Sequence, residues 1–307
     1  MTAVDMTVRL GPLTLPNPIV AASGTYGHGD EVARQGDASK IGAVTVKSVS
    51  ADPWSGNPPP RVHETPAGML NSVGLQNPGV EAWRDVELPS LVARGARVIA
   101  SVWGRTVDDF ARAAKGVSEA TSDLVAIEVN VSCPNLEDRS HMFAHSCEGT
   151  RSAVAAVVAH SAGLPVFAKL SPNVTDLREI AAAAVDAGAT GVTLINTLMG
   201  MAIDPETRRF RLGAGGGGLS GPAIRPVAVR AVHDVSRALP GVPIIGTGGV
   251  AEAEDAAEMM LAGATAVGVG TAAFRDPRAP EKIAARLERW CRRHGVSAVS
   301  ELIGAVE

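Results

Sequence analysis

Amide, lysine and cysteine side chains gather where apolar runs of this sequence stop. They are Lys47, Ser48, Asn71, Asn77, Asn130, Ser132, Cys133, Asn135, Lys169, Ser171, Asn196 and Thr197. Amides both donate and accept hydrogen bonds, and lysine adds positive charge. The set favours a planar ligand of alternating N–H and C=O groups with a carboxylate or an electron-rich edge. For any single residue, exposure at a strand end explains the polarity equally well. Paired carboxylates for glycoside hydrolysis and a His/Asp cluster for a metal are both missing.

The segment NVSCPN, residues 130–135, contains a cysteine with several possible roles. A lone buried cysteine is most often a small packing residue, and without a CxxC pair a metal or cluster ligand is not expected. Cys133 instead follows an apolar run and stands among polar residues. The ordinary pKa of a thiol is about 8.5 and nearby cations lower it, so Cys133 could remove a proton from carbon as a general base. A nucleophilic role would need a partner such as His141 or His145, and neither has an evident orienting group.

Glycines follow the last two apolar runs, in GTGGV and GVGTAAF. If these runs are the seventh and eighth strands of a barrel, the loops after them often bind phosphate through backbone N–H groups. Gly248, Gly249, Gly270 and Thr271 fit such a site, although tight turns need glycines too. The phosphate could belong to a cofactor or to a substrate.

Eight short apolar runs recur along the chain. They span residues 18–23, 43–48, 97–102, 125–131, 166–170, 191–196, 242–249 and 265–270. Their nearly continuous apolar character is typical of parallel strands buried on both faces. Because alanine-rich helical stretches lie between many of them, the pattern predicts an α/β fold, a single (β/α)8 TIM barrel. An open doubly wound sheet is the alternative, but it usually has fewer strands and an early GxGxxG motif.

Long segments follow the second, fourth and sixth predicted strands, at 49–79, 136–150 and 197–220. Loops of this length are usually functional or disordered, so we expect irregular active-site loops at the barrel mouth. Residues 6–16 are expected to form a small hairpin over the opposite end. Nothing suggests a second unit, and residues 1–307 are predicted to form a single domain.

Composition argues against several classes of partner. The 307 residues carry a net charge of −4 without a block of like charge, and only 3% are aromatic, so no nucleic-acid surface is expected. No apolar stretch approaches the ~18 residues of a membrane span, and the N-terminal residues do not resemble a secretory signal. The three cysteines are few and odd in number, which fits a reducing compartment. We therefore expect a cytoplasmic protein.

Five segments, in order along nearly the whole chain, carry a family resemblance: GNPPPRVHETPAGMLNSVGLQNPG, NVSCPN, FAKLSPN, INT and GGLSGPAIRP. Together they resemble dihydroorotate dehydrogenase, a flavin enzyme family of pyrimidine biosynthesis. The resemblance implies a (β/α)8 barrel with one FMN per chain that oxidises (S)-dihydroorotate to orotate. Cysteine at the base position is similar to the soluble class 1 enzymes, because the membrane-associated class 2 uses serine. The first and last segments look most like the FMN subunit of class 1B.

Residue roles follow from the same resemblance. Cys133 would remove the C5 proton of dihydroorotate while the C6 hydride passes to the flavin. Residues implied in substrate binding are Lys47, Asn71, Gly74, Leu75, Asn130, Asn135, Asn196 and Thr197. Residues implied in FMN binding are Ser23, Gly24, Lys47, Ser48, Asn130, Lys169, Ile195, Gly221, Gly248, Gly249, Gly270 and Thr271. Lys169 would lie against the flavin N1/O2 edge, where negative charge accumulates on reduction. No metal site is implied.

Class 1B also implies partners. There the FMN subunit pairs with a polypeptide that carries FAD and a [2Fe-2S] cluster, and NAD+ is the acceptor. A homodimer, and a heterotetramer with that electron-transfer subunit, are thus implied. The missing cluster cysteines agree with a cluster held by the partner. A class 1A enzyme that uses fumarate stays open.

The chain departs from the family pattern at several positions. Ser101 stands where an asparagine beside the flavin is expected, and Tyr26 and His28 stand where phenylalanine is expected. Cys147 is an additional cysteine in the loop after Cys133. We interpret Cys147 as an incidental thiol, with a Cys133–Cys147 redox link as the alternative.

Three rival functions share some of these features. A dihydropyrimidine dehydrogenase-type reductase of uracil or thymine also uses a cysteine, but it needs no lysine for a carboxylate and its chains carry cluster cysteines. A Schiff-base aldolase would use Lys169 as its nucleophilic amine, with the glycines holding a substrate phosphate. Dihydrouridine chemistry on tRNA would need a basic surface that the net charge does not offer.

Overall fold

The computed structural model describes residues 3–132 and 142–307, and its centre is a closed barrel of eight strands. The strands are β3 (Ile19–Ala21), β4 (Ala43–Thr45), β7 (Val98–Val102), β8 (Leu124–Asn130), β9 (Val166–Lys169), β10 (Gly191–Leu194), β15 (Ile244–Thr247) and β16 (Ala266–Val269). All neighbouring pairs are parallel, and β16 closes the barrel on β3. Each strand overlaps an apolar run of the sequence, so the predicted TIM barrel is confirmed.

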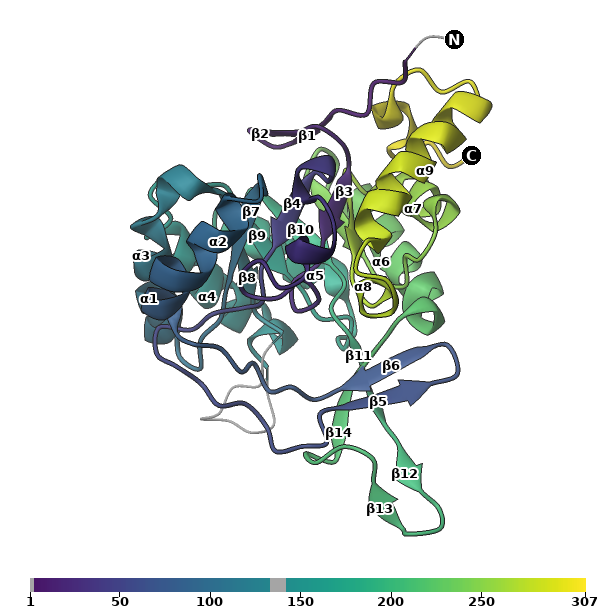
Figure 1. Cartoon of the computed structure of the whole chain (residues 1–307). Coiled ribbons are helices and arrows are strands. Elements are labelled where there is room, and N and C mark those ends of the chain that lie inside the picture. The colour runs from purple at the N-terminus through teal and green to yellow at the C-terminus, as the bar shows by residue number, and fades with distance from the viewer. Residues whose placement is uncertain (1–2, 133–141) are drawn as a thin grey trace.

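Helices surround the barrel (Figure 1). They are α1 (Val80–Ala82), α2 (Leu88–Val92), α3 (Val107–Ser118), α4 (Cys147–Val158), α5 (Leu177–Asp186), α6 (Arg225–Ala238), α7 (Ala253–Leu261), α8 (Ala272–Arg275) and α9 (Ala279–Arg293). A π-helical turn, Trp83–Glu87, joins α1 to α2. Between β3 and β4 the chain forms two 3-10 turns, Ala33–Gln35 and Ala38–Lys40, and α9 packs against β3. Within the described residues, no helix is both long and apolar enough to cross a membrane.

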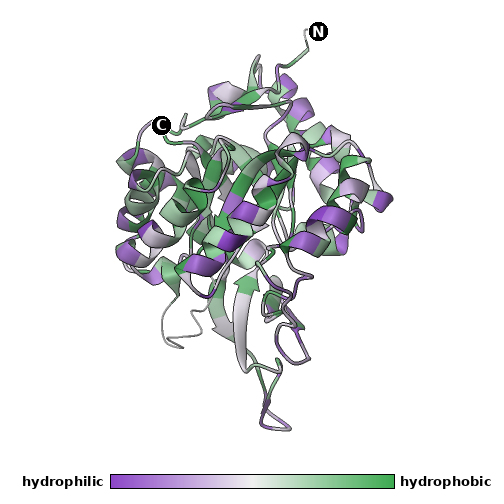
Figure 2. Cartoon of the chain, turned by 90° about the vertical axis from the view of Figure 1, so that its left-hand side faces the viewer, coloured by the Kyte–Doolittle hydropathy of each residue, from purple (hydrophilic) through white to green (hydrophobic). Residues whose placement is uncertain are grey.

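Burial explains why the strands read as continuous apolar runs. All five residues of β7 are buried, as are all four of β10, β15 and β16. One side of each strand faces the barrel interior and the other faces the helices, so both sides need apolar residues. Figure 2 shows the strands mainly in hydrophobic colours, whereas the outer helices carry hydrophilic stretches. At the start of α3, Thr106 and Asp109 form a reciprocal capping box.

The long segments after β4 and β10 are not the irregular loops that we expected. They form a four-stranded sheet in the order β11 (Leu198–Met201), β14 (Gly216–Ser220), β6 (Gly68–Asn71) and β5 (Val62–Thr65), and a hairpin of β12 (Ile203–Asp204) and β13 (Arg209–Phe210). We predicted a loop at β14 because its sequence is rich in glycine. Yet a Cβ at Gly217 would lie 2.4 Å from the Asn71 carbonyl oxygen, so this strand needs glycine to approach β6 closely. The sheet extends from one end of the barrel (Figure 1).

The predicted N-terminal hairpin is confirmed as β1 (Val8–Leu10) paired with β2 (Leu13–Leu15). Its turn residue Gly11 faces Thr190 and Pro243, with a built Cβ 2.5 and 3.9 Å from their side chains. These two residues precede β10 and β15, so the hairpin covers the N-terminal ends of the strands. Figure 1 shows it at the opposite end from the four-stranded sheet.

Candidate active site

The ends of β4 and β8 meet at the barrel mouth through Ser48 and Asn130. Asn130 Nδ2 donates to Ser48 Oγ at 3.1 Å, and Asn130 Oδ1 accepts from the backbone N–H of Ser132 at 3.2 Å. Ser48 and Asn130 are 2% and 7% exposed. A Cβ at Gly24 would lie 3.8 Å from Lys47 Nζ, so the lysine lies beside the turn after β3. Four predicted site residues therefore lie close together, namely Gly24, Lys47, Ser48 and Asn130.

Lys169, the last residue of β9, contributes a buried cation. It lies opposite Asn130 of β8 and Thr193 of β10 in the barrel ladder, and it is 6% exposed. In the described part of the chain, no hydrogen bond or ion pair reaches its ammonium group. Burying a cation is costly unless acceptors or an anion face it. This position therefore suits a ligand with an electron-rich or negatively charged edge.

Asn196 and Thr197 follow β10 and meet the four-stranded sheet. The backbone N–H of Thr197 donates to Asn196 Oδ1 at 2.9 Å. A Cβ at Gly218 of β14 would lie 2.0 Å from Thr197 Oγ1, and Asn71 Nδ2 donates to the Gly218 carbonyl oxygen at 3.3 Å. The sheet thus brings Asn71, which is far away in sequence, next to the residues after β10.

The predicted phosphate-binding residues also lie together. A Cβ at Gly249 would lie 2.9 Å from the Gly221 carbonyl oxygen, and one at Gly248 would lie 3.6 Å from Ile195. Gly248 and Gly249 have positive φ angles of 139° and 75°, respectively, in a region that favours glycine. Thr271 Oγ1 donates to Ser220 Oγ at 2.8 Å, which joins the turn after β16 to the same place.

The turn after β3 completes this side of the mouth. Ser23 Oγ donates to the Val46 carbonyl oxygen at 2.8 Å, and a Cβ at Gly270 would lie 3.6 Å from the Ala22 Cβ. The turn after β3 is therefore bound to the end of β4 through Ser23, and Gly270 at the end of β16 lies beside this same turn. At the end of β15, the buried Thr247 Oγ1 has no hydrogen-bond partner among the described residues.

Other predicted residues are less closely tied to this group. Cys133 and Asn135 lie outside the described residues. Gly74 and Leu75 lie in the loop after β6, where their carbonyl oxygens accept from Trp54 Nε1 at 3.0 Å and from Asn77 Nδ2 at 2.9 Å. These bonds fix the loop to the segment after Ser48 and not directly to Asn130 or Asn196.

The two positions where phenylalanine was expected carry neutral side chains. Burial, with help from Glu281 and Asp37, raises the pKa of Tyr26 to about 12. Burial and the nearby Lys47 cation lower the pKa of His28 to about 4, against the opposing effect of Glu31. Both groups are therefore uncharged at neutral pH, as a phenylalanine would be.

Sequence reasoning missed two buried polar residues beneath the mouth. Glu128 of β8 and Thr193 of β10 are 2% and 3% exposed, and Thr193 Oγ1 donates to Glu128 Oε2 at 3.0 Å. Ser101, noted only as a departure from the family, donates to Glu128 Oε1 at 3.4 Å. The sequence did contain a signal, which is Glu128 inside the apolar run VAIEVNV. A charged residue is almost never fully buried unless it has partners, so Glu128 indicated further polar residues beside it.

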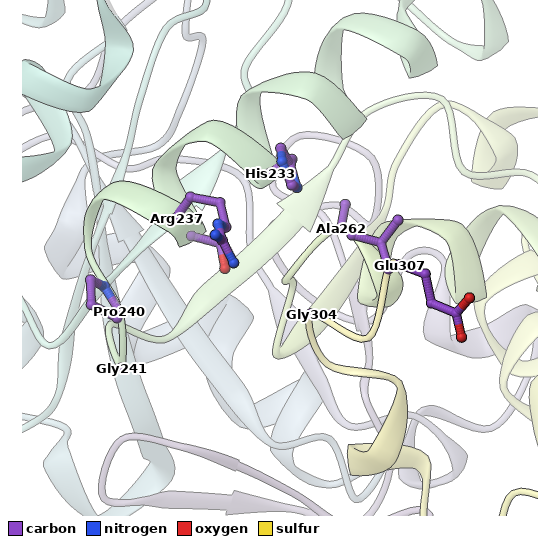
Figure 3. A pocket seen from close by; sticks show the side chains of 9 residues that line it. His233, Arg237, Pro240, Gly241, Ala262, Gly304 and Glu307 are labelled. Carbon is purple, nitrogen blue, oxygen red and sulfur yellow. The ribbon is translucent and has the colours of Figure 1, made fainter.

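A separate surface cavity of about 570 Å³ lies among α6, the turn before β15 and the C-terminal residues (Figure 3). His233, Arg237 and Glu307 contribute its charged or titratable side chains. The turn before β15 belongs to the N-terminal end of the barrel, so this cavity is at the other end from Asn130 and Lys169. No group of three or more histidine, cysteine, aspartate or glutamate side chains in the described ranges could hold a metal ion.

Comparison with known proteins adds independent information. The family model described as dihydroorotate dehydrogenase matches residues 6–290. The chain belongs to the dihydroorotate dehydrogenase family. It is therefore an oxidoreductase, and the resemblance of its motifs to this family is confirmed.

Individual dihydroorotate dehydrogenase relatives match over nearly their full length. The protein named dihydroorotate dehydrogenase B (NAD(+)), catalytic subunit, of Desulforudis audaxviator is 50% identical over 307 residues, which is 98% of this chain and 97% of that protein. Proteins of the same name from Pelobacter propionicus and Geotalea daltonii are 48% and 46% identical, and cover 99% and 100% of both chains.

Proposed function

We propose that this chain oxidises (S)-dihydroorotate to orotate in pyrimidine biosynthesis, with FMN bound at the barrel mouth. The observation that carries the proposal is the position of Lys169, a buried residue whose ammonium group has no hydrogen bond or ion pair among the described residues, beside the amide-rich ends of β8 and β10. Orotate is a flat ring of imide groups with a carboxylate, which amides and a cation suit well. Membership in the dihydroorotate dehydrogenase family supports the same reaction.

The described residues fit FMN. When bound, FMN supplies the acceptor for the C6 hydride of dihydroorotate. Lys169 would face the flavin edge on which negative charge accumulates, because a buried cation needs such a partner. The phosphate would lie at Gly248, Gly249, Gly270 and Thr271, with Ser23, Gly24, Lys47, Ser48, Asn130, Ile195 and Gly221 around the remainder of the cofactor.

Substrate binding is assigned to the residues on the other side of the mouth. Asn130 and Asn196 would bond the pyrimidine ring, and Lys47 would add positive charge near its carboxylate. Asn71, Gly74, Leu75, Asn135 and Thr197 complete the proposed set. Cys133 would act as the general base that takes the C5 proton.

Electrons would leave through a second polypeptide. The relatives are named catalytic subunits of dihydroorotate dehydrogenase B (NAD(+)), which supports a partner with FAD and a [2Fe-2S] cluster and NAD+ as the final acceptor. A homodimer that binds two such partners is part of this proposal. Exposed apolar side chains on β11 to β13, including Met199, Ile203 and Phe210, support contact with another chain.

One experiment tests the core of the proposal. The purified chain is supplied with FMN, its absorption spectrum is recorded, and dihydroorotate is added without oxygen. A yellow protein that bleaches is the expected result. Bleaching only by a dihydropyrimidine without the carboxylate would favour a uracil or thymine reductase. A protein that stays colourless would favour the aldolase reaction, which borohydride trapping at Lys169 would then test.

A further inference from the structure

A continuous series of hydrogen bonds runs from Glu128, inside the barrel, to Asn130 at the mouth. Glu128 accepts from Thr193 at 3.0 Å and from Ser101 at 3.4 Å. Ser101 Oγ and Ser48 Oγ are 2.9 Å apart, and Asn130 Nδ2 donates to Ser48 Oγ at 3.1 Å. All five residues are buried, so these groups depend on each other for their hydrogen bonds.

The series has only one direction in which every donor meets an acceptor. Both carboxylate oxygens of Glu128 accept a hydrogen bond, one from Thr193 and one from Ser101, so the single hydroxyl proton of Ser101 is used by Glu128. Ser101 must then accept from Ser48, and the Ser48 proton points into the barrel. Ser48 consequently has only lone pairs for the mouth, and one of them takes an N–H of Asn130.

The other end of the Asn130 amide agrees with this direction. Its Oδ1 accepts from the backbone N–H of Ser132, and a backbone N–H can only donate. A rotated amide would place Nδ2 against that N–H and Oδ1 against a Ser48 oxygen whose proton is already used. Both contacts would be lost, so the orientation of Asn130 is determined from two sides.

We propose that Ser101 and Glu128 are positioning residues that act through Ser48. They hold the Asn130 amide in one orientation and make Ser48 Oγ an acceptor toward any ligand at the mouth. The inference rests on the proposed function, in which Ser48 and Asn130 bind FMN and Asn130 also binds dihydroorotate. It gives Ser101, which stands in place of an expected asparagine, a role inside the barrel instead of a direct role at the flavin.

A matched pair of substitutions tests this role. Ser101→Ala and Thr193→Val each remove one hydroxyl from the Glu128 carboxylate, but only Ser101→Ala breaks the series that leads to Asn130. The first measurement is the FMN dissociation constant of the apoprotein. The second is the side-chain amide NMR signal of Asn130 in asparagine-labelled apoprotein, assigned by its absence in Asn130→Asp. This second measurement requires no flavin.

Ser101→Ala is expected to raise the FMN dissociation constant about tenfold, the effect of roughly one hydrogen bond, and to shift the Asn130 signal. Thr193→Val is expected to leave the FMN dissociation constant within about twofold of the parent value and the Asn130 signal unshifted. Ser101→Cys, a near isostere with a weak donor and acceptor, should shift the Asn130 signal in the same direction to a smaller extent, and it replaces Ser101→Ala if that variant does not fold.

Equal effects of the Ser101 and Thr193 substitutions on the Asn130 signal would overturn the inference, because a merely structural role of the carboxylate predicts that equality. An unshifted Asn130 signal in the Ser101 variants would overturn it too. Failure of the parent protein to bind FMN would instead overturn the proposed function, and the Asn130 signal would still decide the inference separately.

Discussion

The side chain of Thr197 lies directly against Gly218 of β14, since a Cβ at position 218 would be 2.0 Å from Thr197 Oγ1 and 2.6 Å from its Cβ. Neither atom is the far end of a flexible side chain, so a larger residue at 218 must displace Thr197 or separate the strands. The sheet outside the barrel therefore constrains a residue that we assign to dihydroorotate binding.

Gly218→Ala is expected to raise the KM for dihydroorotate about tenfold, because the displaced Thr197 loses roughly one hydrogen bond to the substrate. FMN content should stay unchanged. The matched control is Gly216→Ala in the same strand, where a Cβ would meet only the Gly200 carbonyl oxygen at 3.4 Å. Neither glycine has a positive φ, so steady-state kinetics of the two variants isolate the steric effect. Equal KM values in both would contradict the role of Thr197.

Cys133→Ala is expected to keep FMN and to slow flavin reduction by dihydroorotate about 10²- to 10⁴-fold, the usual contribution of a general base. Anaerobic stopped-flow absorbance measures that rate. Cys147→Ala serves as the control, because Cys147 begins α4 with a free thiol. Flavin reduction in this variant should proceed at the parental rate. Parental reduction rates in Cys133→Ala would sink the base assignment.

Lys169→Met is expected to act in opposite directions on two properties. The apoprotein should become more stable, with a higher Tm, because Lys169 is buried without a hydrogen bond or ion pair among the described residues, and burying a cation in this way is costly. FMN binding should become about tenfold weaker or more, because the cation facing the flavin edge is lost. Differential scanning fluorimetry and flavin titration measure the two effects, with the exposed Lys115→Ala as control. A lower apoprotein Tm would show that Lys169 has a structural partner.

His28→Phe is expected to reduce the acid sensitivity of the fold. The pKa of His28 is lowered from 6.5 to about 4, so between these values the unfolded chain binds a proton that the folded chain does not. Stability therefore rises with pH across this window, and above pH 6.5 the effect is absent. Urea unfolding at pH 7 and pH 5 should show a smaller loss for His28→Phe than for the parent protein. An equal loss would mean that His28 is solvated in the folded state.

Periodicity alone indicated the barrel, because each strand is buried on both faces and must be continuously apolar, as in VIASV of β7. The motif residues also identified which positions would lie at the mouth, since parallel strands end on the same side. The four-stranded sheet was not predicted. Its strand β14, GGGLS, has no apolar alternation. Gly217 and Gly218 are explained only in the folded chain, where the Asn71 backbone and the Thr197 side chain approach them.

The hydrogen-bonded series from Glu128 to Asn130 is a second feature that the sequence did not predict. The five motif segments were enough to indicate a family, and the types of Lys47, Asn130, Lys169 and Asn196 were enough to indicate a kind of ligand, because these properties depend on local sequence. The hydrogen-bond partners that orient these side chains depend on contacts between strands distant in sequence. Ser48, Ser101 and Glu128 come from three different strand regions, and a hydrogen bond of 2.9 Å between two serines 53 positions apart leaves no periodic trace in the sequence. Only closure of the barrel brings them together.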